Sequence, residues 1–276
     1  MTATQFSIFH IDEPDGPGRH GTGEAYEYHE LVNLAFRSVA LFHPGCGRTL
    51  LTDNQTVRWE GLPSDVAVKR GPADPRLMLA RLEAEIGFVR DAPAAALLVS
   101  LDGDILVNCS LAGLADGTWD IALTYRDDEE WPINGGVAFV DGGRRGNALK
   151  FLDQVRLRYL DDEAADSGWW GHQRALIETL GRAEFAARDA DEMVIDGVAV
   201  RLLPCDTFNF SPSEDGRDLG RELRDRRVLH FKGSRKVWMA PYFRAYLATR
   251  ESRSPMALLG AAVSRARLRI RSRQRR

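Results

Sequence analysis

The chain has 276 residues, of which 44% are hydrophobic and 28% charged, and its formal net charge is −3. This is an ordinary composition for a soluble globular protein. No apolar stretch reaches the ~20 residues that a membrane span needs, and the N-terminus lacks the basic and apolar regions of a signal peptide. The three cysteines are scattered without metal-ligand spacing, which is typical of buried thiols in a reducing compartment. We therefore expect a cytoplasmic protein.

Strands and helices alternate in the first half of the chain. The apolar patterns predict strands over residues 6–11, 49–53, 66–68 and 94–101, a loop over 12–23, and two helices. The first helix has apolar positions from Leu31 to Phe42 and ends before Pro44-Gly45. The second opens at Asp74-Pro75, an N-cap followed by proline at the first helical position, and extends to about Val89.

The second half continues the pattern. It predicts strands over 119–125, 137–140 and 198–203, a tight turn over 132–136, helices over about 147–160 and 170–183, and a last, basic helix opened by Ser254-Pro255. The alternation indicates an α/β fold built around a mostly parallel central sheet flanked by helices. We expect one domain over residues 1–240 and a basic helical tail over 241–276.

Charge is unevenly distributed along this chain. Residues 265–276 carry seven arginines and no acidic residue, so the net charge of the remainder is near −10. An acidic main body excludes nucleic-acid binding there on charge grounds. The tail lacks the interleaved aromatic residues that would favour such binding, and we expect no nucleic-acid partner.

Two carboxylates follow the most apolar run of the sequence. Residues 94–101 have almost no polar atom and are typical of a strand buried on both faces in a parallel sheet. Sheets of that kind bind ligands beyond the carboxyl ends of their strands. Asp102 and Asp104 point the same way if the chain stays extended. They then form a paired oxygen site for a hard divalent cation, with room for a ligand's phosphates.

A second segment offers complementary chemistry, from His230 to Trp238. His230 can present a neutral imidazole nitrogen to a metal. Gly233 allows the backbone to approach a ligand closely, and Lys236 can neutralise a diphosphate as a point charge. A surface basic turn is the alternative interpretation of this segment taken alone.

Together these two segments resemble a known family. Asp102-Gly103-Asp104, and His230 followed at fixed spacing by Gly233, Lys236 and Trp238, are similar to motifs of the metal-dependent GT-A nucleotide-sugar glycosyltransferases. That group includes glycogenin and the bacterial lipopolysaccharide galactosyltransferases. Relatives carry proline where Val237 stands here. The resemblance covers roughly residues 5 to 240 and implies a single Rossmann-like GT-A domain.

The resemblance also implies a donor site. Asp102, Asp104 and His230 would hold Mn²⁺ or Mg²⁺, which offsets the negative charge that builds on a departing diphosphate. Gly233 and Lys236 would contact the donor diphosphate. The implied donor is a UDP-sugar, the implied acceptor is a glycan or a lipid-linked molecule, and the implied stereochemistry is retention.

Further residues are implied on the sugar side of the site. Asn134 and Gln173 would lie beside the transferred sugar, and Gly135 belongs to a segment that lines the same side. His172 stands where relatives usually carry aspartate. A neutral imidazole can hydrogen-bond a sugar hydroxyl but cannot act as a carboxylate nucleophile, so the nucleophile is left unassigned.

Two residues carry weaker signals. Asp53 follows a predicted strand and could touch the nucleotide, and a helix cap or turn is the alternative. Arg81 lies on the helix before the apolar run, a region from which an arginine reaches the donor in relatives. A solvated helix face is the alternative for Arg81.

The tail has two interpretations. Its apolar residues alternate with arginines, which suits an anionic membrane surface and would make the protein a peripheral membrane protein. The same helix could instead dock on the catalytic domain. The apolar positions are Met256, Leu258, Leu259, Ala262, Val263, Leu268 and Ile270.

Two other functions remain as alternatives. A phosphatase-like hydrolase also places two aspartates one residue apart after a buried strand. In that class the position of Leu106 is usually Thr or Val, and the segment around His230 would have no role. A non-catalytic protein that binds a sugar nucleotide is the other alternative, and the intact set of metal-ligand types argues against it.

Overall fold

A sheet of eight strands, in the order β3-β2-β1-β4-β7-β6-β9-β8, organises the part of the chain that the computed structural model describes. The described residues are 4–12, 28–56, 59, 61–93, 95–161, 170–187 and 191–273. The strands are β1 (Thr4–Phe9), β2 (Gly47–Asp53), β3 (Ala67–Gly71), β4 (Leu97–Leu101), β6 (Ile121–Tyr125), β7 (Ile133–Asp141), β8 (Glu192–Ile195) and β9 (Val198–Pro204).

The strand directions confirm the predicted α/β fold with a mostly parallel sheet. β3, β2, β1 and β4 are parallel to one another. β7 runs antiparallel to both β4 and β6, β9 is parallel to β6, and β8 is an antiparallel edge strand. β4 is buried along its whole length, as its uninterrupted apolar sequence predicts.

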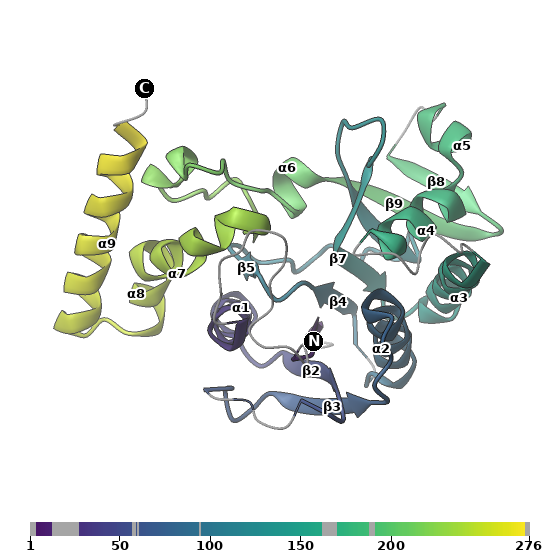
Figure 1. Cartoon of the computed structure of the whole chain (residues 1–276), viewed down its shortest axis with the longest axis horizontal. Coiled ribbons are helices and arrows are strands. Elements are labelled where there is room, and N and C mark those ends of the chain that lie inside the picture. The colour runs from purple at the N-terminus through teal and green to yellow at the C-terminus, as the bar shows by residue number, and fades with distance from the viewer. Residues whose placement is uncertain are drawn as a thin grey trace.

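Helices cover both faces of the sheet (Figure 1). α1 (Tyr28–Phe42) packs on one face, and α2 (Leu77–Asp91), α3 (Arg145–Asp161) and α4 (Gly171–Leu180) pack on the other. Successive β4 residues therefore enter different cores, because strand side chains alternate between faces. Val99 packs with Phe36 of α1, and Leu98 packs in the core that contains Leu82 of α2.

A separate two-stranded sheet lies next to the end of β4. β5 (Ile105–Val107) pairs antiparallel with β10 (Val228–His230), and His230 lies opposite Ile105. Neither of these short strands is among the strands predicted above. This pairing brings the two motif segments together although they are distant in sequence.

The remaining elements are short and most of them follow β9. They are α5 (Arg182–Ala186), α6 (Cys205–Phe208), η2 (Arg217–Gly220), η3 (Gly233–Trp238), α7 (Met239–Tyr242), the π-helical turn η4 (Phe243–Leu247) and α8 (Ala248–Glu251).

Two predicted features of the second half are wrong. The tight turn over 132–136 is absent, because β7 already begins at Ile133. In place of a turn, the pairing of β6 with β7 shifts its register, between Leu123 and Thr124 of β6. The helix predicted over 170–183 ends at Leu180, since Gly181 adopts a left-handed φ of 77° and α5 begins after it.

Boundaries in the first half also shift. The first strand is β1 at Thr4–Phe9, not 6–11, and most of the predicted loop over 12–23 lies outside the described residues. Asp74 is not the cap of α2, which begins at Leu77. Its Oδ1 instead accepts a hydrogen bond from the backbone N–H of Arg76, at 2.7 Å. The short aspartate side chain closes a local turn, which competes with helix capping.

The C-terminal helix α9 (Pro255–Arg273) begins at Pro255, as predicted. It packs against η2 and η4, with Ala261 and Leu268 buried in the contact. Among the described residues, no helix combines the length and apolarity needed to cross a membrane.

Candidate active site

The acid pair lies where β4 leaves the sheet. The backbone N–H of Asp102 donates to the carbonyl oxygen of Gly136 on β7, at 2.9 Å. The chain then turns at Gly103, where an added Cβ would lie only 2.8 Å from Val32 of α1. The pair therefore sits on a tight turn and not on extended chain. Even so, Asp102, Asp104 and His230 each place a ligand atom within 4.8 Å of the others.

His230 faces both carboxylates from the end of β10. Its Nε2 is 3.2 Å from Oδ1 of Asp104 and 3.5 Å from Oδ2 of Asp102. His230 and Asp104 are buried, and the side chain of Asp102 is 21% exposed. The structure thus brings together the three residues predicted to hold a metal.

A chain of hydrogen bonds behind His230 fixes its tautomer. Thr124 Oγ1 donates to the carbonyl of Asn134, at 2.8 Å, so it accepts from Nδ2 of Asn209, at 2.7 Å. Oδ1 of Asn209 then faces Nδ1 of His230, at 2.9 Å, and Nδ1 must carry the proton. The tautomer follows from this network of partners.

This arrangement fits a cation. With its Nδ1 bonded to Asn209, His230 directs Nε2 toward the carboxylates of Asp102 and Asp104. A positive charge at Nε2, from a proton or from a bound cation, holds the three groups together. An imidazole nitrogen held by a hydrogen bond on its other nitrogen is the usual form of a histidine metal ligand. The donor set of one nitrogen and two carboxylates suits Mn²⁺ or Mg²⁺.

Lys236 completes the charged cluster from η3. Its Nζ lies 2.9 Å from Oδ2 of Asp104 and 5.7 Å from the ring centre of Tyr28. Burial by itself raises the pKa of Asp104, but His230 and Lys236 outweigh it and hold the pKa of that carboxyl well below its usual range. Asp104 is therefore ionised at neutral pH, as a metal ligand must be.

Gly233 opens η3 with a φ of 62°. No atom lies within 4 Å of the position of an added Cβ, so backbone conformation and not crowding favours glycine there.

Arg81 holds the other carboxylate in place. The guanidinium contacts Oδ1 of Asp102 at 2.5 Å and Oε1 of Glu85 at 2.9 Å, and it donates to the carbonyl of Gly135 at 2.8 Å. Burial raises the pKa of Glu85 even though Arg81 lowers it. Arg81 is buried, so the alternative of a solvated helix face is wrong.

Gly136 is a site residue that sequence reasoning missed. A Cβ added there would lie 2.6 Å from Cε1 of His230 and 2.8 Å from Oδ2 of Asp102. Only glycine lets strand β7 pass this close to both side chains. In the sequence, the only sign of this close approach is the Gly135-Gly136 pair within an apolar segment, a pattern that also predicts a turn.

Two small cavities meet the end of β1. One, of about 60 Å³, is bordered by Arg81, Asp102, Asp104 and Lys236. The other, of about 150 Å³, includes Asp53 in its wall, and Phe9 and Ile11 line both.

Asp53 also has a role in the local turn. Its Oδ1 accepts backbone N–H groups of Gln55 and Thr56, at 3.2 and 2.7 Å. Asp53 therefore stabilises a local turn, as its alternative interpretation predicts, and it also lines the second cavity.

The predicted sugar-side residues gather where α4 meets β7. An added Cβ on Gly135 would lie 3.3 Å from Nδ1 of His172. Burial, aided by nearby Arg81, lowers the pKa of His172 to about 3, so its imidazole is neutral. Nε2 of Gln173 is buried and has no hydrogen-bond partner among the described residues. Asn134 Oδ1 accepts the N–H of Gly136 at 3.0 Å, which shapes the strand.

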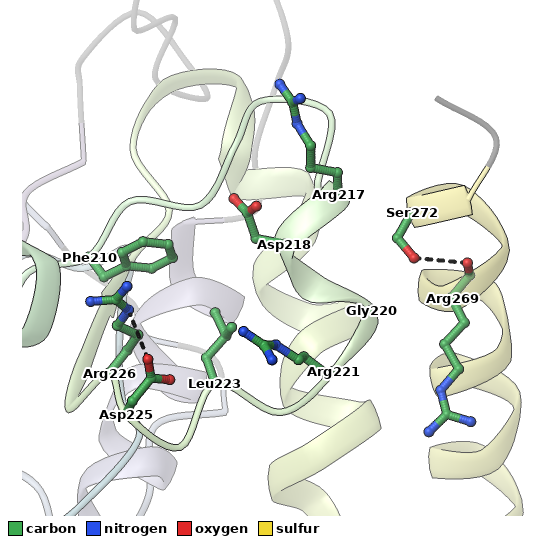
Figure 2. Close-up of a pocket in the computed structure, with 10 residues that line it drawn as sticks. All are labelled: Phe210, Arg217, Asp218, Gly220, Arg221, Leu223, Asp225, Arg226, Arg269 and Ser272. Atoms are coloured by element: carbon green, nitrogen blue, oxygen red, sulfur yellow. Dashed lines mark hydrogen bonds and ion pairs between the residues drawn. The ribbon is translucent and has the colours of Figure 1, made fainter. Parts of the chain in front are cut away.

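A much larger cavity lies away from the acid pair. It has about 740 Å³ and separates the 210–226 segment from α9. Figure 2 shows Arg269 and Ser272 of α9 across the gap from Arg217, Asp218 and Arg221. Size alone does not mark the chemical site, because the larger cavity holds no metal-ligand cluster among the described residues.

Comparison with known proteins places the fold in a class. No family profile matches the sequence, and no curated protein matches it either. Solved structures do resemble it. One is a glycosyltransferase involved in glycosylation of the major capsid of PBCV-1, with a TM-score of 0.51 at 16% identity. The match covers 86% of this chain and 100% of that one.

A second solved structure agrees. The glycosyltransferase GlyE of Streptococcus pneumoniae matches with a TM-score of 0.50 and 16% identity, over 97% of this chain and 63% of its own. At this level of identity the likeness concerns the fold. The chain has a GT-A-like glycosyltransferase fold, and the resemblance noted in the sequence is confirmed at that level.

Proposed function

We propose that this protein is a metal-dependent glycosyltransferase that moves a hexose from a nucleotide-diphosphate sugar, with UDP as the nucleotide, to a glycan or lipid-linked acceptor. The observation that carries the proposal is the convergence of Asp102, Asp104 and Nε2 of His230 beside Lys236. The fold of the solved glycosyltransferases supports it.

Each charged residue has a distinct task in this proposal. Asp102, Asp104 and His230 would hold Mn²⁺ or Mg²⁺, which when bound offsets negative charge on the departing diphosphate. Lys236 supplies a second positive charge for the diphosphate, from a buried position that keeps its electrostatic effect strong. Arg81 keeps Asp102 oriented, because it occupies Oδ1 and leaves Oδ2 toward His230.

The sugar side is assigned to residues at the start of α4. Neutral His172 can donate or accept a hydrogen bond from a sugar hydroxyl, but it is not a carboxylate nucleophile. The buried amide nitrogen of Gln173 offers an unused donor. Asn134 and Gly135 shape the strand below both. Retention of anomeric configuration is part of the proposal through the family resemblance alone.

Thermal unfolding tests the donor and the metal. The protein is heated with UDP, GDP, CMP or dTDP, each with and without Mn²⁺. A ligand at about 100 times its dissociation constant adds ~2.7 kcal/mol of stability. We expect a raised Tm with UDP only when Mn²⁺ is present. A folded protein that responds to no nucleotide would contradict the proposal and favour the phosphatase-like or non-catalytic alternative.

Asp104→Asn supplies the matching variant. It preserves the shape of the side chain and removes the charge, and we expect the shift with UDP and Mn²⁺ to disappear. Asp153→Asn on α3, which pairs only with Arg156 among the described residues, is the control and should respond like the parent. Donor hydrolysis in Mn²⁺ that persists in Asp104→Asn would refute the metal assignment.

We also propose that α9 places the protein on an anionic membrane surface. The helix docks through Ala261 and Leu268, and its outer face exposes Met256, Leu259 and Ile270. Their spacing puts them on one stripe of the helix. Arginines flank the stripe in sequence, and Arg269 borders the large cavity (Figure 2). Apolar and basic surface together favour the interface of an anionic bilayer.

Vesicle co-sedimentation tests this membrane proposal. Met256→Glu with Leu259→Glu should release the protein from anionic vesicles without lowering its Tm, because both side chains are exposed. Leu157→Glu, an exposed apolar position on α3, is the control. Deleting the helix is a poorer test, because it would uncover the core around Leu268. Equal binding of the α9 variant and the parent would overturn the proposal.

A further inference from the structure

A second group of metal-ligand side chains lies outside the acid pair. His10 and Asp12 follow β1, and His29 lies in the first turn of α1. Oδ1 of Asp12 is 3.0 Å from Nε2 of His29 and 3.4 Å from Nε2 of His10. The three ligand atoms all lie within 4.8 Å of one another.

Both imidazole rings are held by aromatic neighbours on their faces. His29 stacks on Trp59, with ring centres 4.1 Å apart and 27° between the planes. His10 stacks on Tyr28 at 5.4 Å and meets the ring of Trp59 edge-on at 5.1 Å. The packing covers the ring faces and leaves the Nε2 edges directed at Asp12, so ring orientation is set before any ligand arrives.

The partners of these residues are fixed as well. Nε1 of Trp59 donates to Oδ1 of Asn33 in α1, at 3.0 Å. The backbone N–H of Asp12 donates to Oγ1 of Thr56, at 3.0 Å. The ligands therefore come from two segments, the chain after β1 and the first turn of α1, and each segment has contacts beyond those among the three ligands.

The two distances from Asp12 to the imidazoles are compatible with a small metal ion. A tetrahedral ion with bonds of 2.0–2.1 Å separates its ligands by about 3.3 Å. The two separations here, 3.0 and 3.4 Å, bracket that value. Two imidazoles and one carboxylate leave a fourth position for water or a ligand, and imidazole nitrogen favours zinc over magnesium or calcium.

We propose that His10, Asp12 and His29 form a second divalent-cation site, specific for Zn²⁺ or a similar transition-metal ion. Its ligands differ from the two carboxylates and one imidazole of the acid pair, so the two sites select different metals. His10 also lines the small cavity beside Asp102 and Lys236. A cation held there places positive charge at the edge of the donor cavity and ties β1 to α1. The site stands on its own geometry and does not depend on the proposed transferase activity.

Cobalt binding tests the site directly. Co²⁺ takes the place of zinc, and four-coordinate Co²⁺ absorbs strongly in the visible range. The full chain carrying Asp102→Asn and Asp104→Asn lacks the carboxylates of the first site. We expect this variant to bind one Co²⁺ per chain in equilibrium dialysis and to show the visible bands. Zn²⁺ added afterwards should displace the colour.

Substitution of the two histidines should remove the Co²⁺ site. Adding His10→Gln and His29→Gln to the same chain should abolish both the stoichiometric ion and the visible bands. Asp128→Asn, an exposed acid outside both clusters, should leave both unchanged. Circular dichroism without metal checks that each variant is folded.

Two results would overturn the proposal. One is a folded Asp102→Asn, Asp104→Asn variant that binds no Co²⁺, which would reduce the role of Asp12 to a hydrogen-bond partner of the two imidazoles. The other is Co²⁺ binding that survives loss of both histidines. Neither result bears on whether UDP and Mn²⁺ stabilise the protein, so this proposal and the proposed function fail separately.

Discussion

The proposed metal cluster, formed by Asp102, Asp104 and His230, and the proposed sugar side, formed by His172 and Gln173, differ in how completely their polar groups are paired. His230 is held by Asn209, Asp102 by Arg81 and Asp104 by Lys236. At the start of α4, by contrast, Nε2 of Gln173 is buried without a partner among the described residues, and His172 is kept neutral by burial.

The difference indicates which part of the site is organised in advance. A buried polar group without a hydrogen bond costs about 1–3 kcal/mol, a cost that a sugar hydroxyl could remove on binding. At the metal cluster, by contrast, protein partners already orient each side chain before a ligand binds. We therefore expect substitutions at the charged end to remove metal binding, and substitutions at α4 to alter sugar recognition while metal binding persists.

Substitution of Gly136 on β7 should give the largest loss of metal binding. Gly136→Ala forces a Cβ to within 2.6 Å of His230 and 2.8 Å of Asp102, so the two ligands must separate. We expect Mn²⁺ affinity by calorimetry to fall by roughly 10²-fold or more, because loss of a group that supports one metal ligand already costs about 10–100-fold and this variant displaces two.

Gly135→Ala is the matched control, one residue away on the other face of the strand. Its Cβ meets Nδ1 of His172 at 3.3 Å, a contact that a small shift relieves. We expect Mn²⁺ affinity to persist while the KM for donor sugar rises. Equal loss of Mn²⁺ binding in the two variants would show that the two regions are not separable.

The hydrogen-bond chain behind His230 gives an intermediate effect. Asn209→Leu keeps the approximate volume but removes the acceptor for Nδ1 of His230. Loss of a group that orients a metal-bound histidine typically costs 10–100-fold in metal affinity, and we expect that range for Mn²⁺ in calorimetry.

Thr124→Val acts one step further along the same chain. It removes the hydroxyl that bonds Asn209, so its effect on Mn²⁺ affinity should have the same sign and be smaller. An unchanged affinity in Asn209→Leu would contradict the tautomer assigned to His230.

The sequence predicts the charged end better than the sugar end, for physical reasons. Asp102 and Asp104 follow a buried parallel strand, and the ends of such strands are where ligands bind. The spacing of His230, Gly233 and Lys236 is local and can be read directly. Nothing local connects His230 to the acid pair, because their contact depends on the β5-β10 pairing.

The missed residues depend on tertiary contacts. Asn209 belongs to no motif, and its role follows from the approach of Phe210 and Val228, whose backbones are hydrogen-bonded at 3.0 Å. Gly136 was visible as a glycine in an apolar segment, but a turn and a close strand crossing give the same pattern. The periodicity of apolar residues is enough to predict the fold class. The roles of Asn209 and Gly136 depend on contacts between segments that are distant in sequence.

The titration of His172 should give the smallest effect, a change in how the free energy of unfolding depends on pH. It tests the proposed sugar side alone. The folded pKa of about 3 lies below the unfolded value near 6.5. The unfolded chain therefore binds more protons between these values, and stability contributed by neutral His172 is present above pH 6.5 and is lost as pH falls toward 3. Each pH unit within that window costs about 1.4 kcal/mol at most for one such group.

Denaturant unfolding between pH 6.5 and 4.5 measures this loss. His172→Gln removes the titrating group, and we expect the free energy of unfolding to fall less steeply with pH than in the parent. His43, whose pKa burial lowers to about 4, is far from the site in sequence and titrates with the same sign, so it remains as an internal reference in both proteins. An identical slope in the two proteins would mean that His172 is not held neutral by the fold, and its assignment to an uncharged contact with sugar would fail.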